Sequence, residues 1–142
     1  MAKACVFCQI VAGTLPAHVV MSDDIAMAFL DTRPLFEGHT LLVPRDHHET
    51  LGELPPAMIE PVFSRVQLLA QVMEDDFGAA GSFVAMNNRI SQSVPHLHVH
   101  VVPRNPPDGL RGYFWPRTTY RDQQHAAAVA ADLATAYAAR QR

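Results

Sequence analysis

The chain has 142 residues, the length of one average domain, so we expect a single domain with one sizeable core. Hydrophobic residues make up 49% and charged residues 18%, an ordinary globular composition, and no apolar run reaches the roughly 18 residues that a membrane span needs. The formal net charge of −3 argues against a general nucleic-acid-binding protein, because such proteins neutralise phosphates with excess positive charge.

The first half of the chain is predicted to hold a short helix and three strands. Residues 6–12 can form one or two helical turns. Three apolar segments follow, each bounded by turn residues, and we expect strands over residues 19–21, 25–30 and 40–43.

The second half contains the strongest helix signal. Between residues 55 and 77, apolar side chains recur at the i, i+3, i+4 and i+7 positions of an amphipathic helix, although Pro61 lies about one turn inside it. Two more strands are predicted over residues 82–86 and 96–102, and an alanine-rich helix over residues 122–140. Because the helices are few and do not alternate with the strands, the pattern favours the α+β class, an antiparallel sheet with helices packed at one face.

The predicted strand 96–102 is the most informative segment, because it contains three histidines at alternate positions. Side chains alternate across a strand, so His96, His98 and His100 share one face, and the residues between them point toward a core. A solvated polar face has no need of histidine, which leaves two chemical interpretations. A histidine pair can bind a metal together with a third histidine, as in zinc hydrolases, or one neutral imidazole can attack phosphorus while its neighbours orient it.

The residues just before this strand help to choose between the two. Gln92 and Ser93 offer an amide and a hydroxyl, which suit phosphate oxygens and are poor zinc ligands. A further histidine, His39, stands at the start of the predicted strand 40–43. The sequence therefore favours a histidine that reacts with a phosphate.

Cys5 and Cys8 are too few for a disulfide scaffold. The N-terminus lacks the apolar region of a signal peptide, so we expect a cytoplasmic location, where this spacing indicates metal or redox chemistry. No strand–helix–strand context surrounds the pair, which argues against a thioredoxin-like redox site. Two inert buried thiols remain an alternative to the favoured interpretation, a structural zinc site.

Residues 92–102, Gln-Ser-Val-Pro-His-Leu-His-Val-His-Val-Val, resemble the signature of the histidine triad (HIT) family, and the resemblance extends over residues 5–104. It is closest to the bacterial zinc-containing, nucleotide-binding type. The resemblance implies a single HIT domain over residues 1–142, with residues 105–142 as a helical C-terminal extension to the core. It also implies a five-stranded antiparallel sheet, one long helix, and a two-fold homodimer with the helix at 55–77 as the interface element.

The resemblance implies a nucleotide hydrolase or transferase that attacks the α-phosphorus of nucleoside phosphoramidates or dinucleoside polyphosphates. His98 would be the nucleophile and carry a nucleotidyl-histidine intermediate without a catalytic metal, while His100 and His39 orient it. The remaining matches to the family's purine nucleotide site are Asp31 for the ribose, Asn87, Gln92 and Ser93 for the phosphate, and Val6, Phe7, Ile10, Phe29 and Leu30 around the base. Asn88 is an alternative to Asn87, because the loop is about two residues shorter than the family pattern.

Four metal ligands also follow from the resemblance, namely Cys5, Cys8, His47 and His96, with His48 as an alternative to His47. Zinc bound there would hold the N-terminal segment against the histidine strand and take no part in the chemistry. The aromatic and arginine-rich segment 109–117 either caps a base or a phosphate or packs against the body of the protein or a partner subunit. Two other functions stay open, a nucleotide-binding scaffold with little turnover and a metal-dependent hydrolase with three histidine ligands.

Overall fold

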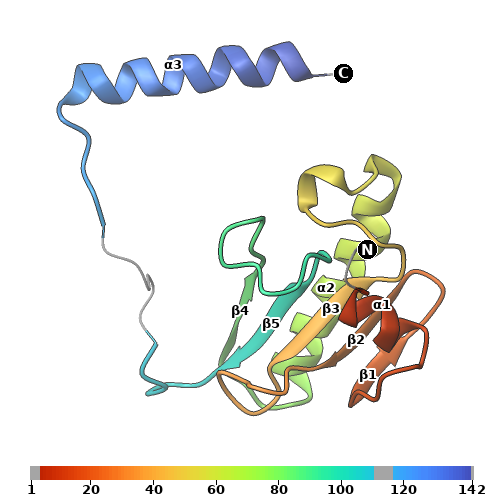
Figure 1. The fold of residues 1–142 in the computed structure, drawn as a ribbon. Coiled ribbons are helices and arrows are strands. Elements are labelled where there is room, and N and C mark those ends of the chain that lie inside the picture. Colours follow the sequence, from red (N-terminus) through yellow and green to blue (C-terminus); the bar gives the residue numbers. More distant parts are fainter. Residues whose placement is uncertain (1–3, 111–116, 142) are drawn as a thin grey trace. The chain divides into compact units, whose positions relative to one another are not determined.

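A computed structural model describes residues 4–110 and 117–141 (Figure 1). The chain divides between Asp108 and Gly109 into two compact units. The first unit contains the sheet and its covering helices, and the second contains helix α3 (Gln123–Arg140). No helix in the described ranges is long and apolar enough to cross a membrane.

The first unit is built on a five-stranded sheet in which every pair of neighbouring strands is antiparallel. In chain order the strands are β1 (Val19–Ser22), β2 (Ala26–Leu30), β3 (Thr40–Pro44), β4 (Gly81–Ala85) and β5 (Val99–Arg104). Their spatial order is β1-β2-β3-β5-β4, so the histidine-bearing strand β5 lies between β3 and β4 (Figure 1). This arrangement confirms the α+β class and the five-stranded sheet.

Helices cover both faces of the sheet, rather than the single face expected from the sequence. The long helix α2 (Pro56–Asp75) packs on one face, and the short helix α1 (Val6–Val11) lies on the other through Phe7. A single-turn 3-10 helix, η1 (Leu51–Glu53), precedes α2 and was not predicted. The core under α2 includes Ala26, Ala28, Leu42, Val62, Val66, Leu69, Met73, Leu97, Val99 and Val101, whereas Met27, Phe29, Leu41 and Val43 pack with Phe7.

The predicted strand 96–102 begins later than expected, because β5 starts at Val99 and contains only the last of the three histidines. If the antiparallel register with β3 continued, Pro44 would face Leu97. Pro44 has no N–H to donate, and its carbonyl oxygen instead accepts a hydrogen bond of 2.9 Å from Nε2 of His96. The side chain of His96 therefore takes the place of a backbone partner for Pro44, and the pairing of β3 with β5 ends at Leu42 and Val99.

The alternation of side chains nevertheless continues through this extended segment. Leu97, Val99 and Val101 are fully buried in the core under α2. The ring of His98 lies on the opposite side, with its centroid 5.1 Å from that of His100. The expectation that the histidines share one face is therefore met although two of them precede the strand.

Helix α3 begins where the sequence predicts, and the side chain of Asp122 caps it by accepting a hydrogen bond from the backbone N–H of His125. Leu133 and Tyr137 are exposed within this unit. Residues 111–116, which make up most of the aromatic and arginine-rich segment 109–117, lie outside the described residues.

Candidate active site

A cavity of about 540 Å³ opens on the sheet face that carries α1, a size within the usual range of small-molecule sites. Its walls come from α1, the loop after α1, strands β2 and β3, and the histidine segment. The residues that line it are Val6, Phe7, Ile10, Leu15, Pro16, Ala17, Phe29, Leu30, Asp31, Thr32, Arg33, Leu41, Ser93, Val94, His98 and His100. The cavity therefore combines a largely apolar wall with one polar end.

His98 lies at the polar end of this cavity with a fixed ring orientation. Its Nδ1 is 2.8 Å from the backbone carbonyl oxygen of His96, and since a carbonyl oxygen can only accept, Nδ1 carries the proton. In the neutral ring the lone pair is then on Nε2. The ring also meets the edge of Phe7, with 5.0 Å between the ring centroids. These two contacts hold a buried imidazole with one unprotonated nitrogen in the cavity wall.

His39 and His100 form a hydrogen-bonded pair beside His98. The backbone N–H of Leu35 donates to Nδ1 of His39 over 3.0 Å, so the proton of a neutral His39 ring is on Nε2. This Nε2 lies 2.9 Å from Nδ1 of His100 and donates to it, which leaves Nε2 of His100 as a donor. Burial is the main reason that the pKa of His39 is lowered and that of His100 falls to about 4. Both rings are therefore neutral at neutral pH. The hydrogen bonds run in series, from the N–H of Leu35 to His39 and from His39 to His100.

Asp31 closes the polar end of the cavity. One carboxylate oxygen accepts a hydrogen bond of 2.8 Å from the backbone N–H of Arg33, and the other lies 3.6 Å from Nε2 of His39. Ligand atoms of Asp31, His39 and His100 all lie within 4.8 Å of one another. A cation on Nε2 of His39 would force the ring proton onto Nδ1, where it would face the N–H of Leu35. The hydrogen bonds of these rings therefore disfavour a metal ion bound by Asp31, His39 and His100 together.

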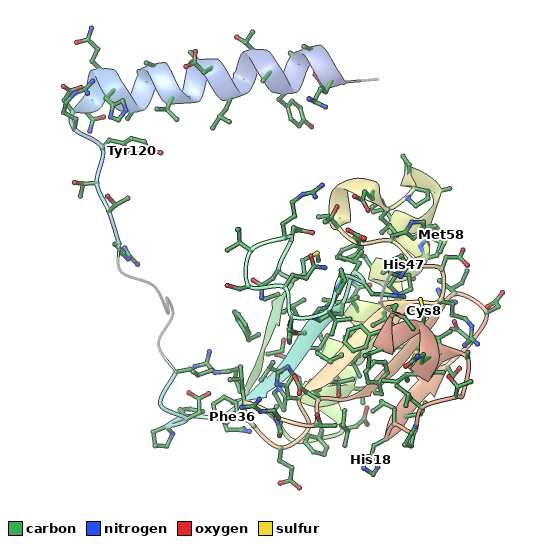
Figure 2. All side chains as sticks on the ribbon, viewed as in Figure 1. Cys8, His18, Phe36, His47, Met58 and Tyr120 are labelled. Atoms are coloured by element: carbon green, nitrogen blue, oxygen red, sulfur yellow. The ribbon has the colours of Figure 1, made fainter. Side chains whose placement is uncertain are left out.

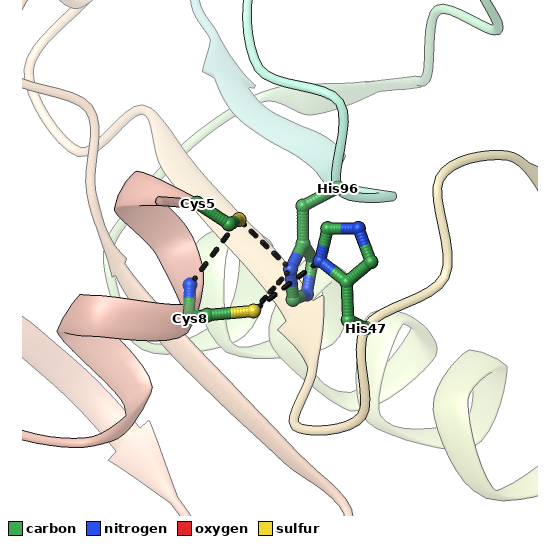
Figure 3. Close-up of side chains that lie close together, drawn as sticks. All are labelled: Cys5, Cys8, His47 and His96. Carbon is green, nitrogen blue, oxygen red and sulfur yellow. Dashed lines mark hydrogen bonds between the residues drawn. The ribbon is translucent and has the colours of Figure 1, made fainter. Parts of the chain in front are cut away.

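A second cluster, of two thiols and two imidazoles, lies beside the first turn of α1 (Figure 3). Nδ1 of His96 is 3.5 Å from the Sγ atoms of both Cys5 and Cys8, and Nδ1 of His47 is 3.2 Å from Sγ of Cys8. Because Nε2 of His96 donates to Pro44, its Nδ1 is unprotonated and faces the sulfurs. In a tetrahedral zinc site, sulfur and nitrogen ligands are roughly 3.6 Å apart. The four residues therefore fit a zinc ion in both spacing and donor type.

The structure also decides between the two candidate histidines after β3. His47 reaches the cluster, and Figure 2 shows it next to Cys8. His48 contributes its backbone carbonyl oxygen, which accepts a hydrogen bond of 2.7 Å from the N–H of Leu97. His47 is therefore the ligand candidate.

Three of the polar residues singled out from the sequence do not line the cavity. The side chain of Gln92 donates to the carbonyl oxygen of Glu49 over 2.6 Å and accepts from the N–H of Arg89. Asn87 donates to the carbonyl oxygen of Ser91, while Asn88 accepts from the N–H of Leu51 in η1. The loop turns tightly, with φ of 71° at Arg89 and 59° at Ser91, so these side chains bond within the loop and to η1.

Sequence reasoning placed Asp31, Ser93, Val6, Phe7, Ile10, Phe29 and Leu30 at the nucleotide site, and all seven line the cavity. It missed the wall formed by residues 15–17 and the contributions of Arg33 and Leu41. Arg33 could have been predicted to line the cavity from its position two residues after Asp31, in the same turn. The loop at 15–17 carries no local pattern that distinguishes a cavity wall from an ordinary turn.

Two known proteins with similar sequences have enzyme names, an adenylylsulfatase and an adenosine 5′-monophosphoramidase. The model of the HIT domain matches residues 12–106. An adenylylsulfatase of Arabidopsis thaliana is 35% identical over 108 residues, which are 75% of this chain but 55% of that protein's length. An adenosine 5′-monophosphoramidase of Candida albicans is 29% identical over 119 residues, 80% of this chain and 78% of that protein.

Solved structures share the fold over nearly the whole chain. A HIT family protein from Bacillus subtilis superimposes with a TM-score of 0.83 at 30% identity, covering 94% of this chain and 96% of that one. A zinc-bound histidine triad family protein from Mycobacterium smegmatis has a TM-score of 0.70 at 34% identity, covering 94% and 97% of the two chains.

Proposed function

Because this chain belongs to the HIT domain family, whose relatives include hydrolases, we propose that it is a nucleotide hydrolase or transferase with His98 as its nucleophile. The substrate class is a nucleoside phosphoramidate, phosphosulfate or dinucleoside polyphosphate. The observation that carries the proposal is the hydrogen bond from Nδ1 of His98 to the carbonyl oxygen of His96, since it leaves Nε2 as a nucleophile in the cavity wall.

The proposed reaction has two steps at the α-phosphorus. The lone pair on Nε2 of His98 forms a bond to phosphorus while the bond to the leaving group breaks, and the leaving group departs with its electron pair. Water then forms a new P–O bond and releases a proton to the solvent, while the P–N bond breaks and its electrons return to Nε2. The Nε2–H of His100 and the hydroxyl of Ser93 supply hydrogen bonds to phosphate oxygens, whose charge grows in the transition state.

The cavity wall suggests how a nucleotide is held. The apolar side chains of Phe7, Ile10 and Phe29 suit the faces of a purine base. Asp31 is an acceptor for the ribose hydroxyls, and it lies between the apolar wall and the histidine pair. Binding by Asn87 and Gln92 remains a prediction that would require rearrangement of their loop.

Cys5, Cys8, His47 and His96 are proposed to hold a structural zinc ion. Bound zinc supplies a cross-link between α1 and the segment that leads to β5. The residues themselves fix the geometry, because His96 keeps its hydrogen bond to Pro44 and offers Nδ1 to the metal. The chemistry at His98 then proceeds two residues further along the same face of this segment.

A homodimer through α2 is part of the proposal. Leu68 and Val72 of this helix are 59% and 40% exposed in the single chain and lie outside the buried core cluster. Light scattering on the purified protein tests the dimer, and Leu68→Glu is expected to shift it toward the monomer. A monomeric wild-type protein would contradict this part of the proposal.

The central experiment is mass spectrometry of protein quenched during turnover of adenosine 5′-phosphoramidate, adenosine 5′-phosphosulfate or a diadenosine polyphosphate. We expect one added adenylyl group on His98 and none in His98→Ala. His18→Ala is the matched control, because this exposed histidine lies at the far end of β1 from Cys8 and His47 (Figure 2). Binding without turnover in both wild type and His98→Ala would instead indicate a nucleotide-binding scaffold.

A further inference from the structure

The cavity carries one cation that the proposed reaction does not use. Among the residues that line it in the described part of the chain, Arg33 is the only one with a permanent positive charge. Its guanidinium group makes no hydrogen bond or ion pair within residues 4–110 and 117–141. An arginine in a ligand cavity with all its donors available is suited to bind an oxyanion.

The backbone of Arg33 is held in place relative to Asp31. The N–H of Arg33 donates to one carboxylate oxygen of Asp31, which closes a tight turn directly after β2. The same loop is fixed at its other end, because the N–H of Leu35 donates to His39 and the N–H of Asp31 donates to the carbonyl oxygen of His39. The backbone of Arg33 is therefore fixed next to the carboxylate that is proposed to bind the ribose, and the side chain extends from that position.

Charge decides which group Arg33 recognises. A plain ribose offers hydroxyl donors, which need an acceptor such as Asp31 and gain nothing from a cation. A ribose that carries a phosphate would be repelled by Asp31, unless a positive charge next to the carboxylate offsets the repulsion. Arg33, two residues further along the same turn, is the lining residue that can supply this charge. In dinucleotide-binding folds an acidic residue binds the free ribose 2′-hydroxyl, whereas an arginine nearby accommodates a 2′-phosphate.

We propose that Arg33 determines specificity by binding a phosphate on the 2′ or 3′ position of the ribose, so that the preferred substrates are nucleotidyl compounds with a phosphorylated ribose. This inference rests on the proposed function, since it takes the position of the ribose from Asp31. An anionic leaving group has the same chemistry, and the experiment separates the two sources of the anion.

The test is calorimetric titration of the zinc-loaded full chain with ligands that have no leaving group, namely AMP, adenosine 2′,5′-bisphosphate and adenosine 3′,5′-bisphosphate. Wild type should bind one bisphosphate about tenfold more tightly than AMP, as expected for one charge-assisted contact. Arg33→Met keeps the aliphatic stem and removes the charge, so its preference should invert and AMP should bind more tightly than either bisphosphate. Arg140→Met, on helix α3, is the matched control and should keep the wild-type order.

The outcomes distinguish this inference from the proposed function. If AMP binds but neither bisphosphate is preferred, or if Arg33→Met keeps the wild-type order, the inference is overturned and the proposed function stands. A loss of kcat/KM in Arg33→Met that depends on the leaving group, without any change in bisphosphate preference, also overturns it. If none of the three nucleotides binds, the nucleotide site itself is wrong and both proposals fail.

Discussion

The backbone carbonyl oxygen of His96 lies 2.8 Å from Nδ1 of His98, so the residue that faces the two cysteines also sets the ring orientation of the residue that lines the cavity. Helix α1 makes a second connection between the two sites. It carries Cys8 toward the thiol–imidazole cluster, and it carries Phe7 and Ile10 into the cavity wall. The thiol–imidazole cluster and the cavity therefore share one helix and one short segment.

Removal of zinc is expected to weaken nucleotide binding more than it slows the chemical step. A six-residue helix is too short to be stable by itself, so α1 depends on the packing of Phe7 and on the proposed zinc cross-link. Chelation should raise the Kd for AMP, increase amide hydrogen exchange in α1 and lower Tm, while kcat is largely retained if the protein stays folded. The Cys5→Ser/Cys8→Ser double variant should no longer respond to zinc. Unchanged exchange and unchanged Kd after chelation would show that the two sites are independent.

Phe7→Ala should destabilise the fold and impair the site. Phe7 is 6% exposed and packs edge-on against Phe29 and His98, with ring centroids 5.4 and 5.0 Å away. Loss of such a side chain typically costs about 3–5 kcal/mol. Urea unfolding measures the change in the free energy of unfolding, and Phe7→Leu should recover most of it. A loss below about 1 kcal/mol would contradict the packing described for α1.

His39→Ala should lower kcat with little effect on KM. The substitution removes the acceptor for the N–H of Leu35 and the donor to His100, so the ring of His100 is no longer held next to His98. Misplacement of a catalytic group typically costs on the order of a hundredfold in rate. The loss of buried hydrogen bonds should also cost about 1–3 kcal/mol of stability. Steady-state kinetics would disprove the positioning role if KM rose and kcat stayed at the wild-type value.

The stability of the fold should decrease as the pH falls from 6.5 toward 4. Burial, and to a smaller extent the neighbouring His98 and His39, lowers the pKa of His100 from 6.5 to about 4, against a smaller opposing effect of Asp31. In this pH range the unfolded chain binds a proton at this position and the folded chain does not, so protonation favours unfolding. Urea unfolding at several pH values should show a smaller slope for His100→Gln than for wild type. In NMR spectra the ring of His100 should titrate near pH 4, and a midpoint near 6.5 would contradict its burial.

Local pattern was enough to identify much of this protein. The apolar segments predicted all five strands, and the helical periodicity predicted α2 despite Pro61, which lies within its second turn. The alternation of His96, His98 and His100 indicated a shared face, because the period of an extended chain is a local property. The spacing of Cys5 and Cys8 likewise indicated a metal site, and in the structure Cys5 caps α1 while Cys8 lies in its first turn, so that both thiols meet the histidines of the cluster.

Contacts between distant parts of the chain decided the rest. His47 rather than His48 joins the cysteines, β5 begins at Val99, and Gln92 bonds to Glu49 instead of the cavity. The proton positions on the histidine rings depend on partners such as Pro44, which is distant in sequence from His96, and Leu35, which lies in the loop before His39. Sequence patterns record the period of each element but not which carbonyl oxygen or N–H a side chain will meet, and that choice is made when the sheet, α1 and the loops pack together.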